Sequence, residues 1–302
     1  WAGQGLNGKI DVRGSSLRSS GQPLGITLPD TPPYRLRGRI AREGSVWSLV
    51  TNDATVGSSA LTADMQYDTA TTPPTLTGKL GGKRLAFADL APSIGADQAP
   101  RAADRVLPTE PFNVPSLAQM NANVQVNLAQ LDFGTPNISP MSDLQVHLTL
   151  ENSHLALSDL SARVAGGRLT GSTSLQADQN PPHWEAALGF TDVDLKRWIP
   201  SLKKGGASSQ SNAPPYLGGT LNAKVSLTGK GNSVADILGS SNGRLNLDLA
   251  NGEMSQLITE AIGLDVAQAL GMLIAGDVPL RLNCARAAAV VQDGVVKTHY
   301  AV

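Results

Sequence analysis

The sequence has few charged and few aromatic side chains. Only 16% of its 302 residues are charged and 4% are aromatic, whereas charged residues make up roughly 25% of an ordinary soluble domain. Gly, Ser, Thr, Asn and Gln are used instead, and they suit turns and solvated strand faces better than exposed helices. The formal net charge of −1 provides no broad attraction to a phosphate backbone, so nucleic acid is not an expected partner.

Cysteine is almost absent. The single residue, Cys284, can form no internal disulfide and offers too few ligands for a zinc site. We expect it to be a small buried side chain on a strand rather than a reactive nucleophile. Such low cysteine usage fits both the cytosol and the periplasm, so it indicates no compartment.

Residue combinations typical of catalysis are missing. The four histidines stand at no metal-ligand spacing, and neither a G-x-S-x-G elbow nor a Rossmann fingerprint occurs. Asp192 and Asp194 resemble a carboxylate pair, but we interpret them as capping residues of a short helix. Residues 229–233 lack the spacing of a phosphate loop, and a strand-to-helix turn explains them better. The sequence therefore predicts no enzyme, no metal and no cofactor.

Long uninterrupted apolar runs are also missing. The most apolar stretch, 261–275, contains Asp265 and Gln268 and is too short to span a bilayer. The sequence opens on Trp1, without a methionine and already in mid-pattern. We therefore interpret it as a piece of a longer protein, and the lack of an anchor here says little about the parent.

The dominant pattern that is present is alternation of apolar and polar residues. It predicts strands with one face in an apolar environment and the other in water. Strands of a parallel sheet buried on both faces would instead show continuous apolar runs, so we expect an antiparallel, meandering sheet. The apolar positions of the longest alternating runs are Val124, Val126, Leu128, Leu144, Val146, Leu148, Leu155, Leu157, Leu221, Val225, Leu227, Leu245, Leu247 and Leu249.

Helical patterns are rarer and short. We expect helices at 116–120, 192–200, 233–238 and 253–275, with Ser116 and Ser233 as N-caps. Two stretches without periodicity, 95–113 and 201–215, are predicted linkers. They divide the chain into three strand-rich units, 1–94, 114–200 and 216–302, and the last unit contains the helix at about 253–275.

An internal repeat accompanies the strands. The motifs Val56-Gly57-Ser58, Pro73-Pro74 and Asp89-Leu90-Ala91-Pro92 recur in the same order as Ala165-Gly166-Gly167, Pro181-Pro182 and the segment 194–200, with an offset of 108 or 109 residues. Leu6-Asn7-Gly8-Lys9-Ile10 also aligns with Leu221-Asn222-Ala223-Lys224-Val225 at offset 215, close to twice that spacing. We infer duplication of a strand-rich unit, which favours an elongated sheet over a globular enzyme with one pocket.

Several motifs in a fixed order resemble the AsmA family. Residues 76–95, LTGKLGGKRLAFADLAPSIG, are similar to the L-x-G-x-L…L-x-x-x-D-L-x-P-x-I-G segment of that family. Similar stretches follow at 155–160, 165–171, 229–233, 251–254, 280–285 and 293–294. The resemblance covers nearly the whole chain.

The resemblance implies a large periplasmic region of a Gram-negative inner-membrane protein, anchored by an N-terminal helix that is missing here. It also implies a likeness to bridge-like lipid transfer proteins, in which a curved sheet holds acyl chains in a trough. The family has no agreed catalytic residues to carry over. The expected fold is mainly β with a few short helices: an elongated, curved antiparallel sheet that forms an open trough or a partial β-barrel or sandwich.

Three hypotheses for function follow. In the first, the apolar strand face shields phospholipid acyl chains, and the protein supports outer-membrane biogenesis. In the second, the apolar face is a self-filled core, and the sheet edges bind outer-membrane assembly factors by strand addition. The third, a β-helical adhesin or glycan binder, would require clustered aromatic platforms, which the sequence lacks. Separately, Arg35, Arg37, Arg39 and Arg42 predict a basic strand face that is either simply solvated or in contact with anionic headgroups.

Overall fold

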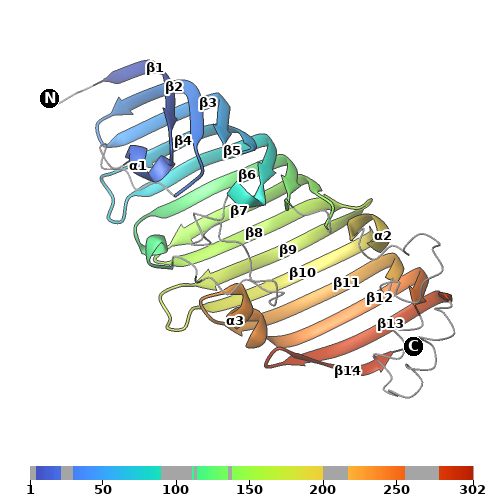
Figure 1. Ribbon diagram of the computed structural model, residues 1–302. Coiled ribbons are helices and arrows are strands. Elements are labelled where there is room, and N and C mark those ends of the chain that lie inside the picture. Colours follow the sequence, from blue (N-terminus) through green and yellow to red (C-terminus); the bar gives the residue numbers. More distant parts are fainter. Residues whose placement is uncertain are drawn as a thin grey trace.

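The computed structural model describes residues 5–21, 30–89, 111, 114–134, 138–199, 217–255 and 279–301. These residues form one fourteen-stranded sheet whose strands lie side by side in chain order (Figure 1). The strands are β1 (Leu6–Gly14), β2 (Tyr34–Glu43), β3 (Val46–Val56), β4 (Ser59–Asp68), β5 (Thr75–Ala86), β6 (Asn121–Asp132), β7 (Met141–Glu151), β8 (His154–Val164), β9 (Gly167–Gln176), β10 (His183–Asp194), β11 (Leu217–Lys230), β12 (Asn242–Ser255), β13 (Pro279–Gln292) and β14 (Val295–Ala301). The helices are α1 (Leu17–Gly21), α2 (Leu195–Trp198), α3 (Val234–Gly239) and the 3₁₀ helix η3 (Val114–Ala118).

Neighbouring strands are antiparallel, as predicted, with one exception. β5 and β6 run parallel, with Thr75 opposite Asn121 and Ala86 opposite Asp132. A parallel pair needs a crossover that returns the chain to the starting end of the first strand. The connection from 87 to 120 has this role and contains η3. Apolar and polar residues alternate in the same way in parallel and antiparallel strands, so the sequence pattern could not reveal that β6 runs parallel to β5.

The sheet is curved and does not close into a barrel (Figure 1). Within the described residues, β1 pairs only with β2 and β14 only with β13. Bulges interrupt several ladders: Asp143, Asp159 and Asp192 have left-handed φ angles of 51°, 52° and 53°, and each lies at a register shift. Asp tolerates this conformation better than most residues, and a bulge bends its strand and increases its twist.

The strand bounds follow the repeat. Shifting β3, β4 and β5 by 108 residues gives 154–164, 167–176 and 183–194, which are the bounds of β8, β9 and β10. The two three-stranded units therefore have the same strand lengths and the same turn positions. The predicted assembly from repeated strand-rich units agrees with this arrangement.

The short helices begin and end differently from the prediction. α3 is confirmed, because the Ser233 hydroxyl accepts a hydrogen bond from the Asp236 N–H at 3.1 Å. α2 begins only at Leu195, with Asp194 as its N-cap, and Asp192 is instead a bulge residue of β10. η3 begins at Val114, two residues before the predicted cap.

The predicted long helix and the predicted linkers lie mostly outside the described residues. The predicted helix at 253–275 is wrong at its start, because residues 253–255 complete β12 and pair with β13; residues 256–275 lie outside the described part. The predicted linkers 95–113 and 201–215 lie outside it apart from residue 111. The expectation for Cys284 is wrong as well, since its side chain is exposed. Cys284 lies opposite Ala250. Its neighbour Ala285 lies opposite Leu249, so the side chains of Ala285 and Leu249 share one face of the sheet and Cys284 belongs to the other.

Candidate functional site: the apolar face of the sheet

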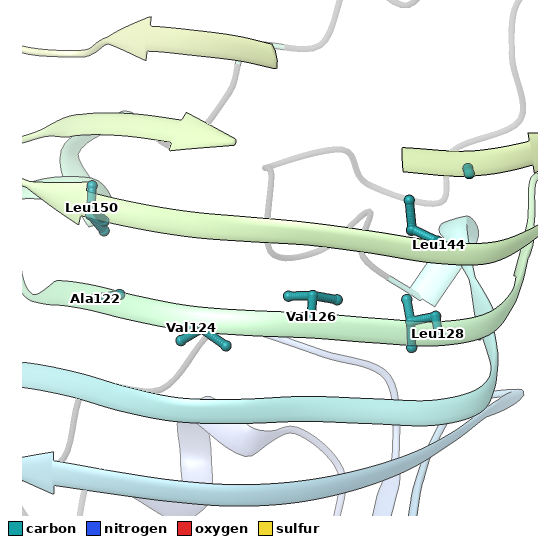
Figure 2. Close-up of a cluster of buried hydrophobic side chains, with 7 residues drawn as sticks. Ala122, Val124, Val126, Leu128, Leu144 and Leu150 are labelled. Atoms are coloured by element: carbon teal, nitrogen blue, oxygen red, sulfur yellow. The ribbon is translucent and has the colours of Figure 1, made fainter. Parts of the chain in front are cut away.

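The cross-strand register places the predicted apolar positions of β6, β7 and β8 on one face. Residues directly opposite each other in a ladder have side chains on the same side of the sheet. Val126 lies opposite Val146, and Leu148 lies opposite Leu157. Figure 2 shows the cluster along β6 and β7 that these strands form.

The same face continues into β11 and β12. Leu157 lies opposite Thr173 on β9, which lies opposite Ala186 on β10. Ala186 in turn lies opposite Leu227 on β11. β11 and β12 then pair Val225 with Leu245. One face therefore carries all fourteen predicted positions: Val124, Val126, Leu128, Leu144, Val146, Leu148, Leu155, Leu157, Leu221, Val225, Leu227, Leu245, Leu247 and Leu249. Between the two groups, β9 and β10 contribute Leu175, Trp184 and Leu188 to this face together with small and polar residues.

The register also adds residues of the first five strands, which sequence reasoning did not place on this surface. Ile40 lies opposite Leu49, Leu49 opposite Met65, and Met65 opposite Gly78, the partner of Val124. Glycine, threonine and tyrosine interrupt the apolar positions of these strands, so their alternation is weaker than in β6 or β7. We call the resulting surface, which extends from β1 to β14, the apolar face.

Exposure varies along the apolar face. In the middle, Leu128 is 2% exposed and Leu150 is 6% exposed, whereas Leu247 on β12 is 36% exposed and Val12 on β1 is 39% exposed. Leu117 of η3 and Met120, both on the crossover, pack against the central cluster. Protein therefore covers the middle of the face, while some positions nearer its two ends, Val12 and Leu247 among them, are open to solvent.

Short helices stand at the two rims of this face. α2 follows β10 and α3 follows β11, and antiparallel neighbours end at opposite sides of the sheet (Figure 1). The ring of Trp198 in α2 lies 5.3 Å from the ring of Phe190. In α3, Ile237 lies over Gly229, where an added Cβ would be 2.5 Å from the Ile237 carbonyl oxygen. Gly229 therefore leaves room for α3 to close that rim.

The opposite face of the sheet is polar. At its amino-terminal end, Asp11 accepts from Arg35 at 3.2 Å and from Arg37 at 2.9 Å. Arg39 also belongs to this face, but the predicted fourth member does not: Arg42 lies 4.9 Å from the centre of the Trp47 ring and alternates to the apolar side. The basic strand face is thus smaller than predicted, and Asp11 partly neutralises it.

Titratable groups in the described ranges form no candidate metal centre, and two carboxylates have a shifted pKa. No group of three His, Cys, Asp or Glu side chains that could hold a metal ion occurs there. The Gly134 N–H and the Arg84 side chain lower the pKa of Asp132, which lies at a strand end. The Ala70 N–H likewise lowers the pKa of Asp68, the last residue of β4. Both carboxylates accept a hydrogen bond from a backbone N–H of the turn that follows them.

Comparison with known proteins shows which family the chain belongs to. The AsmA family model matches residues 13–300. This chain belongs to the AsmA family. It is 30% identical over 315 residues to AsmA family protein YhjG of Escherichia coli (strain K12), an alignment that covers 97% of this chain and 44% of that relative. The AsmA-family chain thus spans less than half the length of the relative, and no solved structure matches it.

AsmA membership supports, for the family as a whole, a role in outer-membrane or lipid-related biogenesis and an association with the bacterial envelope. No helix among the described residues is long and apolar enough to cross a membrane. What the apolar face offers chemically is non-directional contact with aliphatic groups.

Proposed function

We propose that this AsmA-family chain shields or conducts phospholipid acyl chains on its apolar face. In this proposal it is the periplasmic part of an inner-membrane-anchored protein and supports outer-membrane biogenesis. The observation that supports it best is the continuity of the apolar face across every strand. Soluble proteins seldom leave a long apolar surface open, and Val12 and Leu247 are more than a third exposed.

The physical basis is the transfer of methylene groups out of water. Each buried CH₂ is worth about 0.8 kcal/mol, so eight acyl carbons in contact contribute roughly 6 kcal/mol. Neighbouring strands lie about 4.8 Å apart, so similar contact positions recur along the face. Because aliphatic contact has no preferred direction, an acyl chain can shift from one strand to the next with little loss of contact. Such a surface needs no catalytic residue, and we propose that the chain is not an enzyme.

A second candidate function, a scaffold for outer-membrane protein assembly, is favoured by a different observation. Val124 and Leu128 are nearly inaccessible, at 4% and 2% exposed, as expected for a self-filled core. Within the described residues β1 and β14 each have one neighbour, so their outer edges could accept a further strand. In this alternative the apolar face would carry no lipid.

A matched pair of variants separates the two functions. Leu247→Asp places a charge at an exposed position of the apolar face, and Val50→Asp places one at a 45% exposed position of the polar face. Native mass spectrometry and phospholipid extraction of the purified chain measure bound lipid. We expect phospholipid on the unaltered protein and on Val50→Asp, and its loss from Leu247→Asp. A folded, unaltered protein that carries no phospholipid would favour the scaffold.

Photo-crosslinking in cells extends the test to the envelope. A photoreactive residue at position 247 should crosslink to phospholipid, whereas one at position 50 should not. Crosslinks from both positions to protein only would contradict the lipid proposal. Position 126 is a poor choice for this test, because Val126 is only 9% exposed and a larger residue there would disturb packing.

A further inference from the structure

A polar hollow of about 540 Å³ lies over β6, β7, β8 and β9 and reaches Gly82 of β5. Its lining side chains include Asn127, Asp143, Gln145, Ser161, Arg163 and Arg168. Asn127 lies opposite Gln145, and Gln145 lies opposite Ser161, so these three side chains share the polar face. The hollow is thus on the other side of the sheet from the proposed acyl-chain surface.

Two bulges shape this hollow. The register of β7 against β8 shifts on both sides of Gln145, next to Asp143, which has a left-handed φ. The register of β8 against β9 shifts at Asp159, which also has a left-handed φ. Bulges redirect side chains and disrupt the hydrogen-bonded ladder locally. At Asp143 and Asp159 they make part of the polar face concave.

The hollow contains two solvent-exposed arginines that the sheet holds side by side. Arg163 and Arg168 lie directly opposite each other, and like charges at such positions repel. Asp143 accepts from Arg163 at 3.0 Å, which compensates one of them. Arg168 donates to the Ser161 hydroxyl at 3.5 Å and makes no ion pair within the described ranges. One guanidinium charge is therefore left facing the hollow.

The repeat does not require these arginines. A shift of 108 residues relates β8 and β9 to β3 and β4, and it places Thr55 and Ala60 where the second unit has Arg163 and Arg168. The equivalent hairpin therefore forms with an uncharged pair. The arginines belong to this unit alone of the two, which points to a role other than hairpin formation.

We propose that the polar hollow binds a phosphate monoester, with Arg168 as the principal ligand and Arg163 as the second. A planar guanidinium matches phosphate oxygens in bidentate fashion. The amides of Asn127 and Gln145 and the hydroxyl of Ser161 supply further donors for phosphate or adjoining hydroxyl oxygens. No aromatic residue is among the lining side chains, so stacking of a nucleobase or sugar ring is not the basis of recognition. This site is separate from the acyl-chain surface, and phosphate binding there would be a function additional to the one proposed above.

An NMR titration of the ¹⁵N-labelled chain with glycerol phosphate, and with glycerol as the uncharged probe, tests the site. We expect glycerol phosphate to shift the amides around the hollow and glycerol to leave them unchanged. Arg168→Gln should weaken phosphate binding about tenfold or more, the equivalent of losing one charge-assisted contact. Arg244→Gln, on the same face of β12 and outside the hollow, is the matched control and should bind as the unaltered chain does.

A variant that improves binding makes the test stricter. Asp143→Asn removes the carboxylate that competes with phosphate for Arg163, and Asn tolerates the left-handed φ at this position. We expect tighter phosphate binding, which a merely structural role of Asp143 would not produce. Equal binding by Arg168→Gln and the unaltered chain, or equal shifts with glycerol, would overturn the proposal.

The source of the phosphate is read from a competition experiment. Vesicles of phosphatidylcholine with phosphatidic acid, added to the glycerol phosphate complex, should reverse the shifts if the ligand is a lipid headgroup. Retention of the shifts would identify a soluble phosphate monoester as the ligand. Either result supports the site, and absence of shifts with glycerol phosphate excludes it.

Discussion

Truncation of leucines at two positions of the apolar face should have very different energetic costs. Leu128 on β6 is 2% exposed, and Leu247 on β12 is 36% exposed. Replacement by Ala at a closed position loses the transfer free energy of the removed groups and leaves a cavity, together about 2–5 kcal/mol. At Leu247 about three methylene equivalents are removed from a surface that is already partly wet, so the expected cost is about 1.5 kcal/mol.

Urea unfolding followed by tryptophan fluorescence measures both values. We expect Leu128→Ala to lower the unfolding midpoint clearly more than Leu247→Ala, by an amount equivalent to about 2 kcal/mol. Equal costs would contradict the division of the face into a covered middle and open ends. The comparison should use midpoints, because a sheet this long can depart from two-state unfolding.

Added short-chain phospholipid then tests whether the open end is the lipid-binding part. A ligand that binds only the folded state raises its stability in proportion to its affinity. Leu128→Ala should retain this added stability, and Leu247→Ala should lose part of it. The opposite pattern would refute the assignment of acyl chains to the exposed part of the face.

Three further variants probe the fold. Asp89→Ala removes a buried carboxylate that accepts hydrogen bonds from the start of β4 at 2.6 and 2.9 Å, and should lower the free energy of unfolding by about 2–3 kcal/mol, measured in urea. Ser233→Ala removes the N-cap of α3 and should cost about 1 kcal/mol in the same assay. Arg84→Gln should raise the pKa of Asp132, as followed by NMR, because Arg84 helps to hold that pKa low. The stability that this carboxylate confers is present above its ordinary pKa and is lost as the pH falls through the lowered folded-state value.

Each of these variants has a result that would contradict its basis. A fully stable Asp89→Ala would mean that the hydrogen bonds at the start of β4 contribute nothing net. Ser233→Asp should retain α3, since Asp is also a good N-cap; equal losses in both variants would point to packing instead. An unchanged Asp132 pKa in Arg84→Gln would assign the whole shift to the Gly134 N–H.

The one-sided character of the strands could be predicted from the sequence. Period two in β6 and β7 places apolar side chains on one face whatever the neighbouring strand does, and Val124, Val126 and Leu128 are where that rule predicts. The cap of α3 was equally readable, because Ser233 acts on a backbone N–H only three residues away. The repeat and the AsmA resemblance also followed from residues in fixed order along the chain.

How these strands combine could not be predicted from the sequence, because it depends on pairing between strands. The direction of β6 relative to β5 depends on the connection between them, and the alternation of apolar and polar residues within a strand does not indicate that direction. The inclusion of Ile40, Leu49 and Met65 in the apolar face depends on register, which is set between strands and not within one. The exposure of a side chain also depends on distant parts of the chain. Val126 and Leu247 both occupy apolar positions of an alternating strand, yet Val126 is covered and Leu247 is open to solvent.

The polar hollow has the same origin. Its side chains come from four strands, and none of them was singled out as a site by sequence, since an isolated Arg or Gln on a strand is ordinarily a solvated residue. Bulges at Asp143 and Asp159 and the direct pairing of Arg163 with Arg168 bring them together. Local patterns therefore decided which side of each strand is apolar, and pairing over long sequence separations decided which of those surfaces are continuous, covered or concave.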